Sequence, residues 1–102
     1  MNSVQSDYIV KCVDAYDFSS RIWIFLEYMD AGKLTKIITD RNNGDYSEAF
    51  CKYAIYCVVH AVKALHDKNI IHRDIKSDNV LMSFNGDIKL ADLGFSVYLS
   101  KE

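Results

Sequence analysis

Proline is absent from this chain of 102 residues, and cysteine occurs only three times, at Cys12, Cys51 and Cys57. The lack of proline indicates a packed segment without a proline-rich linker. An odd number of cysteines with no CxxC pair argues against a disulfide framework and for reduced thiols inside a cell. The cysteines are therefore expected to be small apolar residues of a core.

Long apolar runs and an excess of positive charge are also missing. No run approaches the roughly 20 apolar residues of a membrane helix, and residues 1–10 show no signal-peptide pattern. Twelve basic and 14 acidic residues give a net charge of −2. We therefore expect a cytoplasmic protein with neither a membrane nor a nucleic-acid partner. The length suits one small domain.

Residue patterns predict a mixed α+β segment. Strands are expected over residues 8–16 and 21–28, joined by a turn at Ser19 and Ser20. A short helix is expected over 34–39 and a loop over 40–45. Ser47 is a candidate N-cap for a long helix to about residue 67, with an apolar stripe at Ile55, Val58, Val59, Val62 and Leu65. Residues 79–83 and 87–91 predict a hairpin whose turn is residues 84–86.

The most informative motif is His-Arg-Asp at residues 72–74, with Asn79 five residues after Asp74 and an Asp-Leu-Gly triplet that begins at Asp92. Phosphoryl transfer from a metal-bound nucleotide needs a carboxylate that receives a hydroxyl proton, a cation at the phosphate, and oxygen ligands for magnesium. Asp74 suits the first role and Lys76 the second. Asn79 and Asp92 suit the third.

At these residues the chain resembles the catalytic core of a eukaryotic protein kinase. The resemblance implies that Asp74, Lys76 and Asn79 are catalytic, and that Asn79 and Asp92 hold Mg²⁺. It implies a structural role for His72, which in the family packs against the residue after the metal aspartate, here Leu93. Leu93 departs from the usual phenylalanine, with little expected effect.

Residues 25–32 resemble the hinge that joins the two kinase lobes. The resemblance implies that the Glu27 carbonyl and the N–H and carbonyl of Met29 line the adenine edge of ATP. Leu26 would then be the gatekeeper at the back of the pocket, and Leu81 the apolar floor below the ring. An extended backbone suits this task because it presents alternating donors and acceptors.

Together the motifs most resemble serine/threonine kinases of the sterile-twenty-like group. The resemblance implies a partial kinase fold with small-lobe strands and hinge in residues 1–28 and the start of the large lobe in 29–102. The Gly-rich phosphate loop and the strand lysine of the family are missing, so the chain is expected to be a fragment, a truncated gene model or a degenerate copy, and to be inactive alone. Its parent protein would use ATP to phosphorylate Ser/Thr hydroxyls of proteins. A small GTPase or a scaffold would regulate the parent through segments outside this chain.

Two alternatives compete with this interpretation. A non-catalytic kinase-like piece that binds partners would carry the same residues, and nothing in the chain separates it from an enzyme fragment. A small-molecule kinase of the aminoglycoside type would share the use of an Asp and an Asn in the catalytic loop. Arg73, Lys76 and the hinge argue against that second alternative.

Overall fold

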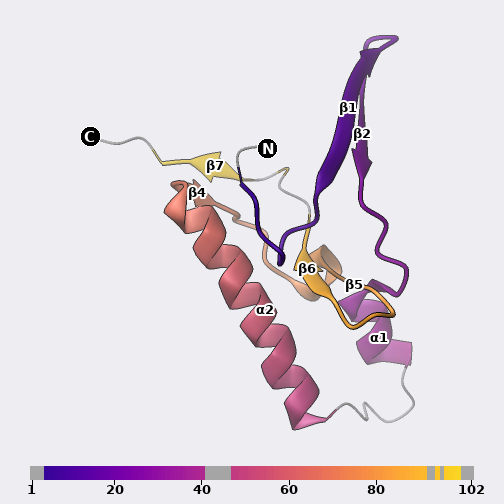
Figure 1. Ribbon diagram of the computed structural model, residues 1–102, viewed down its shortest axis with the longest axis vertical. Coiled ribbons are helices and arrows are strands. Elements are labelled where there is room, and N and C mark those ends of the chain that lie inside the picture. Colours follow the sequence, from indigo (N-terminus) through magenta and orange to yellow (C-terminus); the bar gives the residue numbers. More distant parts are fainter. Residues whose placement is uncertain (1–3, 41–46, 92–93, 95, 100–102) are drawn as a thin grey trace.

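The structure is a computed structural model and describes residues 4–40, 47–91, 94 and 96–99. Figure 1 shows a long helix, α2, along one side and a β-hairpin that projects away from the rest. Helices are segregated from antiparallel strand pairs, which confirms the predicted α+β class. In chain order the elements are β1 (Cys12–Phe18), β2 (Arg21–Leu26), β3 (Gly32–Lys33), α1 (Leu34–Asp40), α2 (Glu48–Asp67), β4 (Ile70–Ile71), the 3-10 helix η2 (Ser77–Asn79), β5 (Val80–Met82), β6 (Ile88–Leu90) and β7 (Val97–Tyr98).

Strands β1 and β2 form the predicted hairpin around Ser19 and Ser20. Phe18 pairs with Arg21, so the turn has two residues, and their φ angles of 56° and 61° are left-handed, as a type I′ turn requires. A non-glycine residue in this region costs about 1 kcal/mol. The predicted bounds were wrong at three ends, because β1 begins at Cys12 and ends at Phe18, and β2 ends at Leu26.

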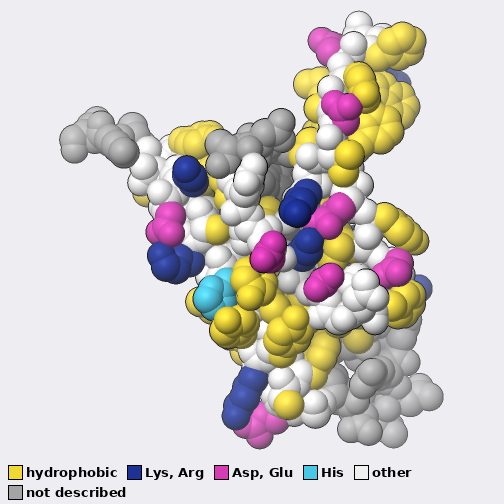
Figure 2. Space-filling view, viewed as in Figure 1, with side chains coloured by type: hydrophobic (Ala, Val, Ile, Leu, Met, Phe, Trp, Pro, Cys, Tyr) yellow, Lys and Arg dark blue, Asp and Glu magenta, His cyan; other side chains and the backbone are white. Residues whose placement is uncertain are grey.

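Both faces of this hairpin are exposed in the described part of the chain. Figure 2 shows hydrophobic side chains gathered over it. A two-stranded hairpin is marginal in water without a third strand or a packed face, so the hairpin adds little stability here. The large apolar side chains of the hairpin are each about half exposed or more: Val13, Tyr16, Phe18, Ile22, Trp23, Ile24, Phe25 and Leu26.

Helix α2 begins where the sequence predicts. The Ser47 hydroxyl accepts the Phe50 N–H at 3.1 Å, which makes Ser47 the N-cap. The predicted apolar stripe was partly wrong, because Ile55 and Val59 are 63% and 58% exposed. The helix instead packs against β6 through smaller side chains, which allow a close approach. The buried positions are Ala54, Cys57, Ala61 and Leu65.

The core lies between α2 and a three-stranded sheet of order β3-β5-β6. Strands β5 and β6 confirm the predicted second hairpin, with Gly86 at φ 95° in its turn. Residues 8–10, predicted as part of the first strand, lie along β6 instead. The Leu90 N–H donates to the Tyr8 carbonyl at 2.8 Å, and the Val10 N–H donates to the Leu90 carbonyl at 3.0 Å. This pairing explains why β1 starts later than predicted.

The three cysteines are free, and Cys57 is buried in the core as expected. Burial raises the pKa of the Cys57 thiol, so this group is held in its neutral form. Most of the predicted loop at 40–45 lies outside the described residues, but Asp40 ends α1. Neither described helix is both long and apolar enough to cross a bilayer.

Candidate active site

A tight turn at the C-terminus of α2 connects this helix to the His-Arg-Asp motif. Asn69 adopts a left-handed φ of 60° directly after the helix C-cap, and its N–H donates to the His66 carbonyl at 2.9 Å. Asparagine tolerates this conformation better than most residues, which is why it ends helices. The short strand β4 then pairs with β7, and the motif follows at once.

His72 is the buried anchor of the motif, with 1% of its surface exposed. Its Nδ1 accepts the Asp74 backbone N–H at 3.1 Å, and its Nε2 lies 2.9 Å from the Ala91 carbonyl. An acceptor at Nδ1 and a carbonyl at Nε2 require the neutral tautomer that carries its proton on Nε2. The predicted structural role of His72 is supported by these bonds. Leu93, its predicted packing partner, lies outside the described residues.

Asp74 is oriented by Asn79. The Asn79 Nδ2 donates to the Asp74 backbone carbonyl at 2.8 Å and to the Asp74 Oδ2 at 3.0 Å. The other carboxylate oxygen, Oδ1, lies 3.7 Å from the Lys76 ammonium. The Asp74 side chain is 25% exposed and that of Lys76 is 55% exposed, so the carboxylate is fixed yet reachable. The structure thus brings together the three predicted catalytic residues.

Asn79 also has an orientation suited to a cation. Because its amide nitrogen is engaged by Asp74, the oxygen Oδ1 is the atom of this side chain that can coordinate a hard metal ion. The Ala91 N–H donates to the Asn79 carbonyl at 2.8 Å, so the residue that precedes Asp92 is attached to Asn79. Asp92 itself lies outside the described residues. Within the described ranges no group of three acidic, His or Cys residues could hold a metal ion.

Two further residues support this loop and were not predicted. The Thr35 and Ser77 hydroxyls share a hydrogen bond of 2.6 Å between α1 and η2. Residues 42 positions apart carry no local signal for such a bond, so only the fold could reveal it.

Arg73 adopts a left-handed φ of 71°. Strain of this kind costs about 1–3 kcal/mol and concentrates at functional sites.

The predicted adenine-binding residues lie on or near β2 and β5. Met29 is 7% exposed, and its carbonyl accepts the Gly32 N–H at 3.2 Å. Leu81 is half-buried on β5. Leu26, the predicted gatekeeper, is 48% exposed because the described residues place nothing over that face of β2.

The Glu27 side chain forms an ion pair that the sequence did not predict. Lys89 Nζ lies 2.9 Å from Glu27 Oε1 and 3.1 Å from Oε2. Burial alone raises the pKa of the Glu27 carboxyl. Hydrogen bonds from the Lys11 N–H and the Lys89 ammonium outweigh burial and lower this pKa below its ordinary value, so Glu27 is charged at neutral pH.

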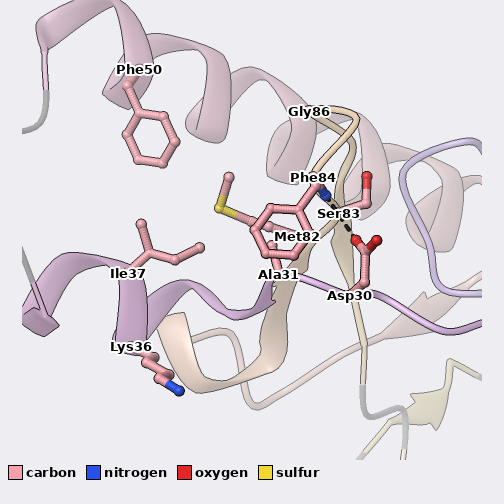
Figure 3. Close-up of a pocket in the computed structure, with 9 residues that line it drawn as sticks. All are labelled: Asp30, Ala31, Lys36, Ile37, Phe50, Met82, Ser83, Phe84 and Gly86. Carbon is pink, nitrogen blue, oxygen red and sulfur yellow. Dashed lines mark hydrogen bonds between the residues drawn. The ribbon is translucent and has the colours of Figure 1, made fainter.

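A groove of about 610 Å³ lies elsewhere, between α1, the start of α2 and the β5–β6 turn. Figure 3 shows Phe84 at its mouth, where the Phe84 N–H donates to Asp30 Oδ1 at 2.8 Å. Ile37 and Phe50 face it from the helices. None of the predicted catalytic or adenine-binding residues lines this groove, so it is distinct from the site built around Asp74.

Comparison with known proteins agrees with this geometry. A protein kinase domain family matches residues 1–102. The serine/threonine-protein kinase shk1/pak1 of Schizosaccharomyces pombe is 42% identical in an alignment of 99 positions that covers 93% of this chain and 14% of that protein. These similarities confirm the kinase resemblance that the motifs predicted.

Two further relatives are similar over nearly the whole chain. The serine/threonine-protein kinase STE20 of Kluyveromyces lactis is 38% identical over 99% of this chain and 10% of its own length. The serine/threonine-protein kinase PAK 4 of Homo sapiens is 36% identical over 100% of this chain and 17% of its own length. The chain therefore spans less than a fifth of the length of these relatives.

Proposed function

The chain belongs to the protein kinase family, and on that premise we propose that it is the central catalytic segment of a serine/threonine protein kinase. The reaction moves the γ-phosphoryl group of ATP to a Ser or Thr hydroxyl of a protein. One observation carries the proposal. The Asn79 amide donates a 3.0 Å hydrogen bond to Oδ2 of the Asp74 carboxylate, and the other carboxylate oxygen, Oδ1, lies on the side of Lys76.

The two oxygens of the Asp74 carboxylate have different roles in this arrangement, since Oδ2 is held by Asn79 and Oδ1 can accept a proton. Asp74 accepts the hydroxyl proton through Oδ1 while the new oxygen–phosphorus bond forms and the bond to ADP breaks. Lys76, half exposed beside Oδ1, stabilises charge on the transferring phosphate. Magnesium, when bound by Asn79 Oδ1 and Asp92, offsets the charge of the ATP phosphates.

The adenine end of ATP is assigned to the hinge. The Glu27 carbonyl and the Met29 backbone accept and donate at the adenine edge, with Leu81 below the ring and Leu26 behind it. The division into small-lobe residues 1–28 and large-lobe residues 29–102, a cytoplasmic location, and control by a small GTPase or scaffold remain predictions.

The test places residues 8–102 in the matching segment of the Schizosaccharomyces pombe shk1/pak1 kinase domain, a protein called the graft below. We expect the graft to phosphorylate Ser/Thr peptides. Asp74→Asn should lower kcat by about 10²–10⁴-fold, the usual contribution of a general base, with ATP affinity unchanged. The matched control is Asp87→Asn, the same change on the distant β5–β6 turn.

The metal assignment has its own test in the graft. Asp92→Ala should abolish magnesium-dependent nucleotide binding, measured by calorimetry, while Asp87→Ala should leave it intact. An inactive graft, or an Asp74→Asn graft as active as its parent, would refute the proposed function. Equal magnesium-dependent binding by Asp92→Ala would refute the metal assignment alone.

A further inference from the structure

The ion pair between Glu27 and Lys89 joins two distant segments, unlike the pair of Lys63 with Asp67 within α2. Its two side chains are 26% and 11% exposed, and the residues are 62 positions apart. The pair of Lys63 with Asp67 joins residues one helical turn apart, and both side chains are more than 60% exposed. Exposed pairs of that kind contribute little, whereas a half-buried bidentate pair constrains geometry.

Glu27 is held on its other side by Lys11. The Lys11 N–H donates to Glu27 Oε1 at 2.8 Å, and the Glu27 N–H donates to the Lys11 carbonyl at 3.0 Å. The carboxylate therefore receives bonds from the segment that leads into β1 and from β6. These donors compensate for the cost of partly burying its charge.

The two residues of the ion pair lie beside different ends of the proposed nucleotide site, Glu27 at the adenine end and Lys89 at the metal end. Glu27 carries the backbone assigned to the adenine edge. Lys89 pairs across the sheet with Leu81, the assigned adenine floor, and lies three residues before Asp92. The ion pair thus spans from the segment for the base to the strand that leads to the metal ligand.

We infer that Glu27 and Lys89 are a positioning pair that sets the distance between the adenine-binding backbone and strand β6, which leads to Asp92. The inference rests on the proposed function. Neither side chain touches the reacting atoms. Their role is to keep two backbones in a spacing that lets ATP reach both at once, and loss of that spacing weakens ATP binding more than the chemical step.

The experiment measures KM for ATP and kcat in the graft. Glu27→Gln and Lys89→Met should each raise KM about tenfold, with kcat within about threefold of the parent. Lys89→Arg keeps the charge and can donate to both carboxylate oxygens, so its KM should stay within about threefold of the parent. The matched control, Asp67→Asn, removes the partner of the exposed Lys63 and should change neither constant.

A second readout separates positioning from a merely structural role. A structural role lowers the folded fraction, and therefore the maximal rate, without changing KM. The double variant Glu27→Gln/Lys89→Met should have a KM no higher than either single variant, because both changes break one link. If Lys89→Met does not fold, the KM of the double variant or of Glu27→Gln decides in its place.

The outcomes distinguish the two claims. An inactive parent graft refutes the proposed function and this inference with it. An active graft in which Glu27→Gln and the double variant keep the parental KM refutes the inference alone. KM increases that multiply in the double variant also overturn it, because the residues would then act independently.

Discussion

Replacing His72 with leucine in the graft tests how the catalytic loop is held. Leucine has nearly the volume of histidine and removes both ring nitrogens, so packing changes little. The Asp74 N–H and the Ala91 carbonyl then lose the bonds of 3.1 Å and 2.9 Å that they now make to the ring. Each buried polar group left without a partner costs about 1–3 kcal/mol, so for these two groups we expect a loss of about 2–6 kcal/mol of unfolding free energy.

The same change should slow catalysis. The Asp74 backbone loses its anchor one residue from Arg73, whose φ of 71° is already strained. We expect kcat to fall about tenfold or more, because small displacements of a catalytic group are costly, while KM for ATP stays near the parental value. Urea unfolding measures the first effect and steady-state peptide phosphorylation the second.

The control for this experiment is His66→Leu at the exposed end of α2. An exposed substitution of this kind is usually within about 0.5 kcal/mol of neutral. Equal urea midpoints for His72→Leu and His66→Leu would refute the anchoring argument. A destabilised His72→Leu graft with parental kcat would show that the anchor does not position Asp74.

Three further predictions concern stability and reactivity in the graft. Ser47→Ala removes the acceptor of the Phe50 N–H and should cost about 0.5–2 kcal/mol in urea unfolding; no change would show that the cap contributes nothing. Burial raises the pKa of the Cys57 thiol, so iodoacetamide should modify Cys57 at least about tenfold more slowly than the half-buried Cys51, and equal rates by mass spectrometry would contradict this. The pKa of the Glu27 carboxyl is held below its ordinary value of 4.5, so its stabilisation is fully present above that pH and is lost as the pH falls below it. The difference in unfolding free energy between the parent and Glu27→Gln should therefore shrink between about pH 5 and pH 3, and a constant difference would refute the charge argument.

Sequence by itself determined the parts of this protein that depend on short spacings. Asp74, Lys76 and Asn79 lie within six residues, and a loop that short has few ways to arrange three polar side chains. The Ser47 cap and the turn at Ser19 and Ser20 are equally local, because a cap or a two-residue turn depends on neighbouring backbone groups.

Tertiary structure alone decided which face of α2 is buried. Periodicity favoured the large side chains Ile55 and Val59, but both are exposed. The sheet approaches the helix closely over Ala54 and Ala61 instead. Hydrophobic periodicity reports an apolar side of a helix, whereas the face that is buried depends on the surface that packs against it.

The same holds for bonds between distant residues. Pairing of residues 8–10 with β6, the Thr35–Ser77 hydroxyl bond and the Glu27–Lys89 ion pair each join segments far apart in the chain. Such contacts leave no mark in local spacing, because the entropic cost of bringing distant segments together is offset only by the contacts of the assembled core. The chemistry of the catalytic loop can therefore be predicted from the residues of the loop itself. The long-range contacts that hold the loop and the hinge in place are seen only in the tertiary structure.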